Sequence, residues 1–338
     1  MAVKLNPFSS LSLRPFVKAY LGKLSPKSDG FRVILRTMST QQKLNLRGIY
    51  PPIPTAFDSN EDISYEKMEY NLKKWDTIPF KGYTVQGSNG EYAYMTYEER
   101  VEMVRRVREI VPKSKLIIAG SGCESTRDTI TLSQKMAAVG ADAVLVVTPC
   151  YYKNGMTDLA MEKHYTAVAD NCPVPVILYS CPGNTGINLS GEVVIKLAKH
   201  PNIIGFKDSG GDVAKLGNIV HKTAGQDFHV IAGSASFLLP ALAVGCSGGI
   251  CALANVVGQE VCDVQTLFEQ GQQKEALTLQ HRLIVPNTDV TRKYGVPGMK
   301  AAMEWYGYYG GPTRSPLQPL SEEDVNKIKK DFQDNGLL

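Results

Sequence analysis

The chain of 338 residues lacks the patterns that mark several large classes of protein. It has no run of 18 apolar residues, which argues against a helix that crosses a membrane. Its seven cysteines form no CxxC pair and its five histidines no HxxxH pair, so we expect neither a disulfide framework nor a metal site. No Walker motif is present, and no Pro-, Gly- or Ser-rich linker interrupts residues 49–270. These absences favour one large domain.

The net positive charge of the chain is confined to its N-terminus. Residues 1–40 hold seven Lys and Arg residues, six serines and a single acid, so the rest of the chain carries a net charge of −2. This composition is typical of a mitochondrial transit peptide, and an unstructured basic tail is the alternative. The body of the chain has no basic patch with interleaved aromatic residues, so nucleic acid is not an expected partner.

From residue 49 onward, short apolar segments alternate with helical ones. Several of the apolar segments are nearly continuous, as parallel strands covered on both faces should be. The predicted strands are 49–57, 82–87, 115–121, 141–149, 174–182, 203–208, 229–234 and 248–255. A helix is predicted over 98–111, where Thr96 and Glu99 form a capping box, and Ser125 with Asp128 begins another in the same way.

Eight strands, each followed by a helix, favour an α/β fold of the closed (β/α)8 TIM-barrel type. A doubly wound sheet usually stops nearer five or six strands. We expect the barrel to span residues 46–271. Residues 272–338 form a C-terminal helical appendage, with predicted helices at 272–285, 296–308 and 321–333.

Lys207 stands out at the carboxyl ends of the predicted strands, where the active sites of TIM barrels lie. It follows an apolar strand, and burial there would lower its pKa and leave a neutral, nucleophilic amine. A lysine paired with Asp208 is the alternative, but alternation along the strand places Asp208 on the opposite face.

Two other strand ends carry polar groups. Tyr179 ends the preceding strand and could pass protons to and from the Lys207 amine, although packing with a capping hydroxyl is an ordinary role for tyrosine. The turn Gly87-Ser88-Asn89-Gly90 offers backbone N–H groups and two polar side chains. Because no Arg or Lys accompanies the turn, it suits a lone carboxylate better than a phosphate.

Two further segments match catalytic or cofactor-binding motifs only in part. Residues 245–249 fit the GxSxG nucleophile elbow, but a helical run precedes them and a strand follows, which is the reverse of what that motif needs. Residues 120–123 resemble the start of a dinucleotide fingerprint whose third glycine is missing. Neither indicates a serine hydrolase or a nucleotide cofactor.

The strand ends together resemble the dihydrodipicolinate synthase/N-acetylneuraminate lyase family. The motifs are GSNGE at 87–91, TPCYY at 148–152, YSCPGNTG at 179–186 and GFKDS at 205–209. The similarity covers residues 46–338, including Arg314-Ser315-Pro316-Leu317. In detail the motifs are most similar to the branch of the family that cleaves 4-hydroxy-2-oxoglutarate to pyruvate and glyoxylate in animal mitochondria.

This resemblance implies a class I aldolase that needs no metal or cofactor and acts on a small 2-oxo acid. Lys207 would form the Schiff base and Tyr179 would relay protons. The remaining implied site residues are Ser88 and Asn89 for the α-carboxylate and the relay, Ser209 and Gly233 for the pocket wall, and Tyr151, or else Tyr152, as a tyrosine donated by a neighbouring subunit. A homotetramer, built as a dimer of dimers, is the assembly implied.

One position departs from the family's pattern. Dihydrodipicolinate synthases carry an arginine for a second carboxylate where this chain has Asn184, which argues against their substrate. Ser209 and Asn184 are the candidates for holding the distal carboxylate of hydroxyoxoglutarate. The competing interpretations are an N-acetylneuraminate lyase-like or dihydrodipicolinate synthase-like enzyme, and a non-catalytic barrel, because a fold does not establish a function.

Overall fold

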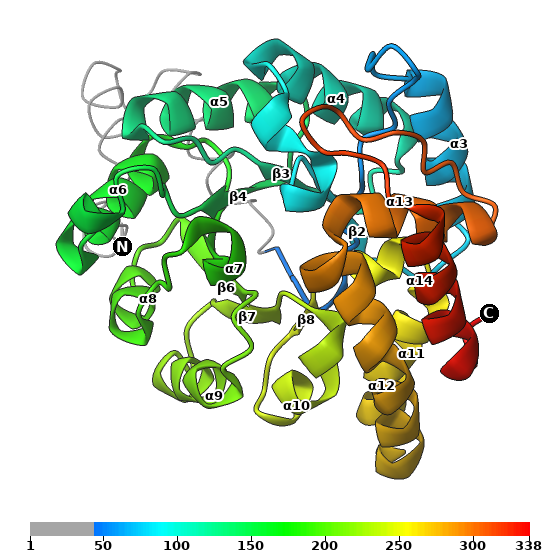
Figure 1. The fold of residues 1–338 in the computed structure, drawn as a ribbon. Helices are drawn as coiled ribbons and strands as arrows, with labels where there is room; N and C mark the ends of the chain where they lie inside the picture. The colour runs from blue at the N-terminus through cyan, green and yellow to red at the C-terminus, as the bar shows by residue number, and fades with distance from the viewer. Residues whose placement is uncertain (1–43) are drawn as a thin grey trace, which may run out of the picture. The chain divides into compact units, whose positions relative to one another are not determined.

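A computed structural model describes residues 44–338, of which Leu46–Leu338 form one compact unit. The predicted transit peptide, residues 1–40, lies outside the described residues. Eight parallel strands run in the order β1-β8-β7-β6-β5-β4-β3-β2 (Figure 1). The strands are β1 (Gly48–Ile49), β2 (Gly82–Val85), β3 (Leu116–Gly120), β4 (Ala143–Val147), β5 (Val176–Ser180), β6 (Ile203–Asp208), β7 (His229–Ala232) and β8 (Gly248–Gly249). A parallel bridge between Pro52 and Thr84 links the ends of this order, which confirms the TIM barrel.

The strands at the point of closure are shorter than the sequence suggested. β1 was expected over 49–57, but Pro51, Pro52 and Pro54 have no N–H to donate to a ladder. β8 was expected over 248–255, but the chain turns into the 3₁₀ helix η5 (Ala252–Asn255). The two strands pair very closely, since a Cβ on Gly248 would lie 2.1 Å from the carbonyl oxygen of Gly48.

A helix follows every strand, and these helices surround the strands (Figure 1). They are α3 (Tyr65–Trp75), α4 (Tyr97–Ile110), α5 (Thr126–Ala138), α6 (Asp158–Asn171), α7 (Pro182–Thr185), α8 (Gly191–Leu197), α9 (Val213–Lys222), α10 (Leu238–Ala243) and α11 (Gly258–Glu269). The capping box at Thr96 and Glu99 begins α4, and the Ser125 side chain caps α5, as predicted. None of the helices in the described part of the chain is both long and apolar enough to span a bilayer.

Three C-terminal helices pack together beside α11 and against one side of the barrel (Figure 1). They are α12 (Gln273–Thr288), α13 (Gly295–Trp305) and α14 (Glu322–Asp334), close to the predicted ranges. Between α12 and α13, residues Asp289–Lys293 form the π-helical turn η6. The Phe332 ring of α14 packs edge-on against Trp305 of α13, with ring centroids 5.8 Å apart.

Candidate active site

A cavity of about 1300 Å³ opens where the strands end. Six of the seven predicted site residues line it: Ser88, Asn89, Tyr179, Lys207, Ser209 and Gly233. Tyr151 does not line it. The rejected GxSxG segment, residues 245–249, follows α10 and includes β8, and none of its residues lines this cavity.

Lys207 lies on β6 directly beside Tyr179 of β5. Its side chain is almost fully buried, and Nζ lies 3.9 Å from the centroid of the Tyr179 ring. Burial lowers the pKa of Lys207 to about 8, because a buried site disfavours the charged form. No carboxylate of residues 44–338 forms an ion pair with it.

Asp208 is engaged on the other side of the strand. Its carboxylate pairs with Lys215 at 2.7 Å and accepts hydrogen bonds from the backbone N–H groups of Gly210 and Gly211. The alternative in which Lys207 is a structural partner of Asp208 is therefore wrong. The lysine is left with an amine that faces the cavity without a counter-ion.

The hydroxyl of Tyr179 meets two serine hydroxyls. Ser209 Oγ lies 3.4 Å from Tyr179 Oη and 3.3 Å from the Gly233 carbonyl oxygen. Burial raises the pKa of Tyr179 well above 10, although hydrogen bonds from Ser209 and Ser88 oppose this. The phenol therefore keeps its proton at neutral pH, and its partners are groups that can both donate and accept one.

Gly233 makes room for this contact. A Cβ at position 233 would lie 2.2 Å from Ser209 Oγ and 2.5 Å from the carbonyl oxygen of Asp208. Any other residue there would push Ser209 away from Tyr179. The role of Gly233 is thus to permit the close approach of β6 and β7.

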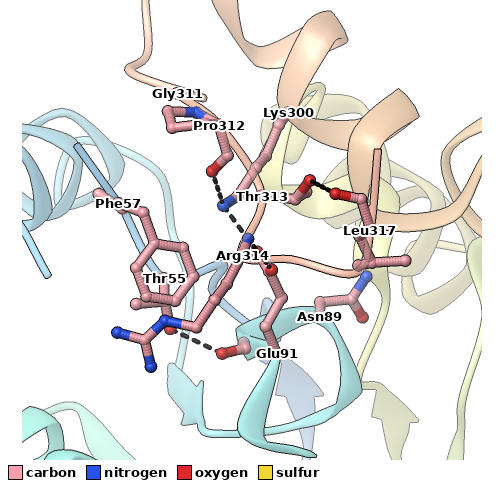
Figure 2. A network of polar contacts seen from close by, with 12 residues as sticks. Thr55, Phe57, Asn89, Glu91, Lys300, Gly311, Pro312, Thr313, Arg314 and Leu317 are labelled. Atoms are coloured by element: carbon pink, nitrogen blue, oxygen red, sulfur yellow. Dashed lines mark hydrogen bonds and ion pairs between the residues drawn. The ribbon is translucent and has the colours of Figure 1, made fainter. Parts of the chain in front are cut away.

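The turn that carries Ser88 and Asn89 is held by a buried network that sequence reasoning missed. Glu91, with a left-handed φ of 57°, pairs with Lys300 of α13 at 2.6 Å, and both side chains are buried (Figure 2). The Arg314 backbone N–H also donates to Glu91, at 2.9 Å. Lys300 Nζ donates further to the Pro312 carbonyl at 2.6 Å. A lysine inside the apolar run of residues 296–303 was the available signal.

A second missed residue, Arg100, supports the neighbouring strand end. This buried side chain donates to the carbonyl groups of Gly120 and Gly122, at 2.9 and 3.2 Å, and its guanidinium lies 4.8 Å from the centre of the Tyr92 ring. Burial lowers its pKa. Arg100 thus fixes the end of β3 at the cavity wall.

The structure does not bring Tyr151 to the Lys207 of its own chain. Its side chain is 76% exposed, that of Tyr152 is 75% exposed, and the two rings meet edge to face. The Glu124 carboxylate holds this loop by accepting hydrogen bonds from the backbone N–H groups of Cys150 and Tyr151, each 2.9 Å long. Both tyrosines therefore project outward from a fixed loop.

No cluster of three or more His, Cys, Asp or Glu side chains suited to a metal ion occurs within residues 44–338. What the cavity does contain is a buried amine with a lowered pKa beside a buried phenol, at the carboxyl ends of barrel strands. This combination can form a Schiff base with a carbonyl compound and move protons around it. Fold and site together define a lyase of the TIM-barrel class.

Residues 45–335 match the model of the dihydrodipicolinate synthetase family, and the chain belongs to that family. It is 36% identical over 295 residues to an uncharacterised DapA-like lyase of Halobacterium salinarum, covering 87% of this chain and 96% of the relative. It is 35% identical over 294 residues to a probable mitochondrial 4-hydroxy-2-oxoglutarate aldolase of Emericella nidulans. That match covers 85% of this chain and 94% of the relative.

Synthases of the family are similarly close. A 4-hydroxy-tetrahydrodipicolinate synthase of Methanoculleus marisnigri is 32% identical over 291 residues, covering 86% of this chain and 99% of the relative. The crystal structure of the dihydrodipicolinate synthase DapA-2 of Bacillus anthracis superposes on this chain with a TM-score of 0.82 at 32% identity. The superposition covers 86% of this chain and 98% of that one. The chain is therefore a pyruvate-dependent lyase of this family.

Proposed function

We propose that this protein is a class I aldolase that cleaves 4-hydroxy-2-oxoglutarate to pyruvate and glyoxylate. The observation that carries the proposal is the buried Lys207 amine, unpaired with any described carboxylate and stacked on Tyr179 in the main cavity. The fungal relative named as a mitochondrial aldolase of this kind and the Asn184 departure favour this substrate within the family.

The reaction begins with attack of the neutral Lys207 amine on C2 of the substrate. Loss of water from the carbinolamine gives a protonated imine, which acts as an electron sink. Removal of the C4 hydroxyl proton then breaks the C3–C4 bond, releases glyoxylate and leaves an enamine on Lys207. Protonation at C3 and hydrolysis of the imine release pyruvate and restore the free amine.

Protons move through Tyr179 in this scheme. Because its pKa is raised, Tyr179 is protonated at neutral pH and cannot act as a base by itself. It acts as a relay, accepting one proton from the substrate while it donates its own to a neighbouring hydroxyl. Ser209 and Ser88 supply that neighbour, and Tyr151 of another subunit extends the relay. Ser88 and Asn89 hold the α-carboxylate at the turn of residues 87–91.

The rate of imine formation should depend on pH through Lys207. With a pKa of about 8, roughly one amine in ten is neutral at pH 7, some 300 times more than at the usual value of 10.5. We expect kcat/KM to rise with pH through an apparent pKa near 8 and to level off above it. Steady-state assays from pH 6 to 9.5 measure this, and a profile that is flat across pH 8 contradicts the assignment.

Reduction by borohydride in the presence of pyruvate tests the proposed chemistry. A Schiff base with pyruvate is reduced to a stable secondary amine, which peptide mapping by mass spectrometry locates. We expect one adduct per chain, at Lys207. An unmodified protein, or an adduct at another lysine, contradicts the proposal and favours a non-catalytic barrel.

The synthase relatives make a dihydrodipicolinate synthase-like activity the second candidate, since they match this chain about as well. An N-acetylneuraminate lyase-like activity is the third. All three would give the same pyruvate adduct, so trapping does not separate them. Pyruvate release from 4-hydroxy-2-oxoglutarate, compared with release from sialic acid and with condensation of pyruvate with aspartate semialdehyde, does separate them.

Tyr151 gives the proposed homotetramer a catalytic role. The exposure of Tyr151 on a loop fixed by Glu124 supports a role in a partner's site rather than in its own. We expect Tyr151→Phe to lower kcat about 100-fold by breaking the relay, and Tyr152→Phe, the matched control, to change it little.

Co-expression shows whether Tyr151 acts across subunits. Chains with Tyr151→Phe keep Lys207, and chains with Lys207→Met keep Tyr151, so a mixed dimer contains one complete site. We expect equal co-expression to restore about a quarter of the normal activity, because about half of randomly formed dimers are mixed. Activity no higher than that of the separate variants contradicts a shared site.

The proposed location is the mitochondrial matrix. It is supported by the basic, serine-rich composition of residues 1–40 and by the name of the fungal relative.

A further inference from the structure

The proposed substrate has two carboxylates, and the residues described so far hold only one. Ser209 and Asn184 were the candidates for the second. The Ser209 hydroxyl already meets Tyr179 and Gly233, and the Asn184 Oδ1 atom accepts from the Cys181 thiol at 3.5 Å. Neither side chain carries a charge, so neither compensates a carboxylate that leaves water.

Three cationic side chains line the cavity: Arg100, Lys207 and Arg292. Lys207 becomes the imine. Arg100 is buried and its guanidinium is bonded to two backbone carbonyls. No carboxylate among residues 44–338 forms an ion pair with Arg292, and no hydrogen bond of its guanidinium to another described residue is observed. Arg292 is thus the cation on this wall with its donors available.

Arg292 belongs to the π-helical turn η6, a type of turn that occurs often at functional sites. Its neighbours Thr291 and Tyr294 also line the cavity. Lys293, by contrast, does not line the cavity; its Nζ lies 3.6 Å from Asp289 and 4.7 Å from the centre of the Tyr294 ring. Two adjacent cations of the same turn therefore have different surroundings.

The guanidinium of Arg292 lies against the segment that follows Lys207 on β6. A Cβ on Gly211 would be 3.7 Å from Arg292 Nη2, and the φ of +87° at Gly211 disfavours any side chain there. Gly210, which lines the cavity, has no side chain either. Neither glycine therefore places a side chain of its own between Ser209 and the Arg292 guanidinium, although the Phe237 ring lies equally close to Gly211.

We propose that Arg292 binds the distal carboxylate of the substrate and sets the preference for a dicarboxylate. An arginine presents two parallel N–H donors that match a carboxylate, and such charged hydrogen bonds are stronger than those of Ser or Asn. This inference rests on the proposed function and assigns the residue that the substrate argument left open.

The test compares substrates with and without the second carboxylate. In Arg292→Gln we expect kcat/KM for 4-hydroxy-2-oxoglutarate to fall about 10- to 100-fold, mostly through KM. The value for 4-hydroxy-2-oxopentanoate, which has a methyl group in place of the distal carboxylate, should stay within about twofold. The pyruvate concentration for half-maximal borohydride trapping should not change, because pyruvate has no second carboxylate.

Lys293→Gln is the matched control, since it removes the same charge from the adjacent position and should leave all three values unchanged. An Arg292→Gln enzyme with an unaltered preference for the dicarboxylate contradicts this inference alone. So does an equal loss with both substrates, which would indicate a structural role. Failure of the unmodified enzyme to cleave 4-hydroxy-2-oxoglutarate contradicts the proposed function, and this inference with it.

Discussion

Replacing Lys207 with methionine should abolish catalysis and stabilise the fold at the same time. Methionine has nearly the length of lysine but no amine, so no Schiff base forms, and we expect kcat to fall by at least about 10⁴-fold with no pyruvate adduct. Folding lowers the pKa of Lys207 from 10.5 to about 8, so the folded protein binds this proton less tightly than the unfolded chain. This weaker proton binding lowers the free energy of unfolding. The whole loss is present below pH 8, and it shrinks to zero as the pH rises towards 10.5.

At pH 7 the free energy of unfolding should therefore increase in Lys207→Met, by up to about 3 kcal/mol. Denaturant titrations at pH 7 and pH 10 measure this, and the gain should shrink at the higher pH. Lys215→Met is the control, because it removes a lysine that pairs with the buried Asp208 and should lower stability. A Lys207→Met protein that keeps substantial activity, or that loses stability, would show that the lysine is structural.

Replacing Lys300 with methionine should have the largest effect on stability. It leaves the Glu91 carboxylate buried without a counter-ion and the Pro312 carbonyl without its donor. Breaking one side of a buried ion pair costs about 3–5 kcal/mol. Denaturant unfolding with an activity assay on the folded fraction measures both consequences, and we expect kcat to fall as well, since Glu91 ends the turn that carries Ser88.

The double variant Glu91→Gln/Lys300→Met separates the charge from the packing. Because it removes both charges, we expect it to be more stable than Lys300→Met alone, with a coupling free energy of about 2 kcal/mol or more. Additive losses would mean that the pair contributes nothing through its charges. Lys330→Met, which breaks an exposed pair with Asp334, is the control and should cost less than about 1 kcal/mol.

The barrel was predictable because the sequence encodes it locally. Apolar runs such as 203–208 mark strands covered on both faces, and the caps at Thr96 and Ser125 mark where helices begin. The prediction of β1 was wrong beyond Ile49, because ladder pairing there depends on prolines and on the close approach of Gly48 and Gly248. The prolines are a local signal that the prediction did not use, whereas the approach of Gly48 to Gly248 is set between distant strands and leaves none.

Some residues of the candidate site could be predicted from local sequence and others could not. Lys207 and Tyr179 could be found because each interrupts or ends an apolar strand, and strand order alone places them side by side. The Glu91–Lys300 pair could not be found, since 209 positions separate its members: Lys300 stands out in its apolar run, but nothing local identifies Glu91 as its partner. Arg100 was missed because it lies on α4, in a segment rich in charged residues.

The network at Glu91 also sets an order of events during synthesis. The turn at residues 87–91 emerges early, but its supports, Lys300, Pro312 and Arg314, belong to the last forty residues of the chain. All eight strands can be complete while this turn still lacks its supports. A chain that stops before residue 300 would thus contain every barrel strand and Lys207 itself, yet it could not hold Ser88 in place. The proposed site is therefore complete only after residues 300–314 have been synthesised.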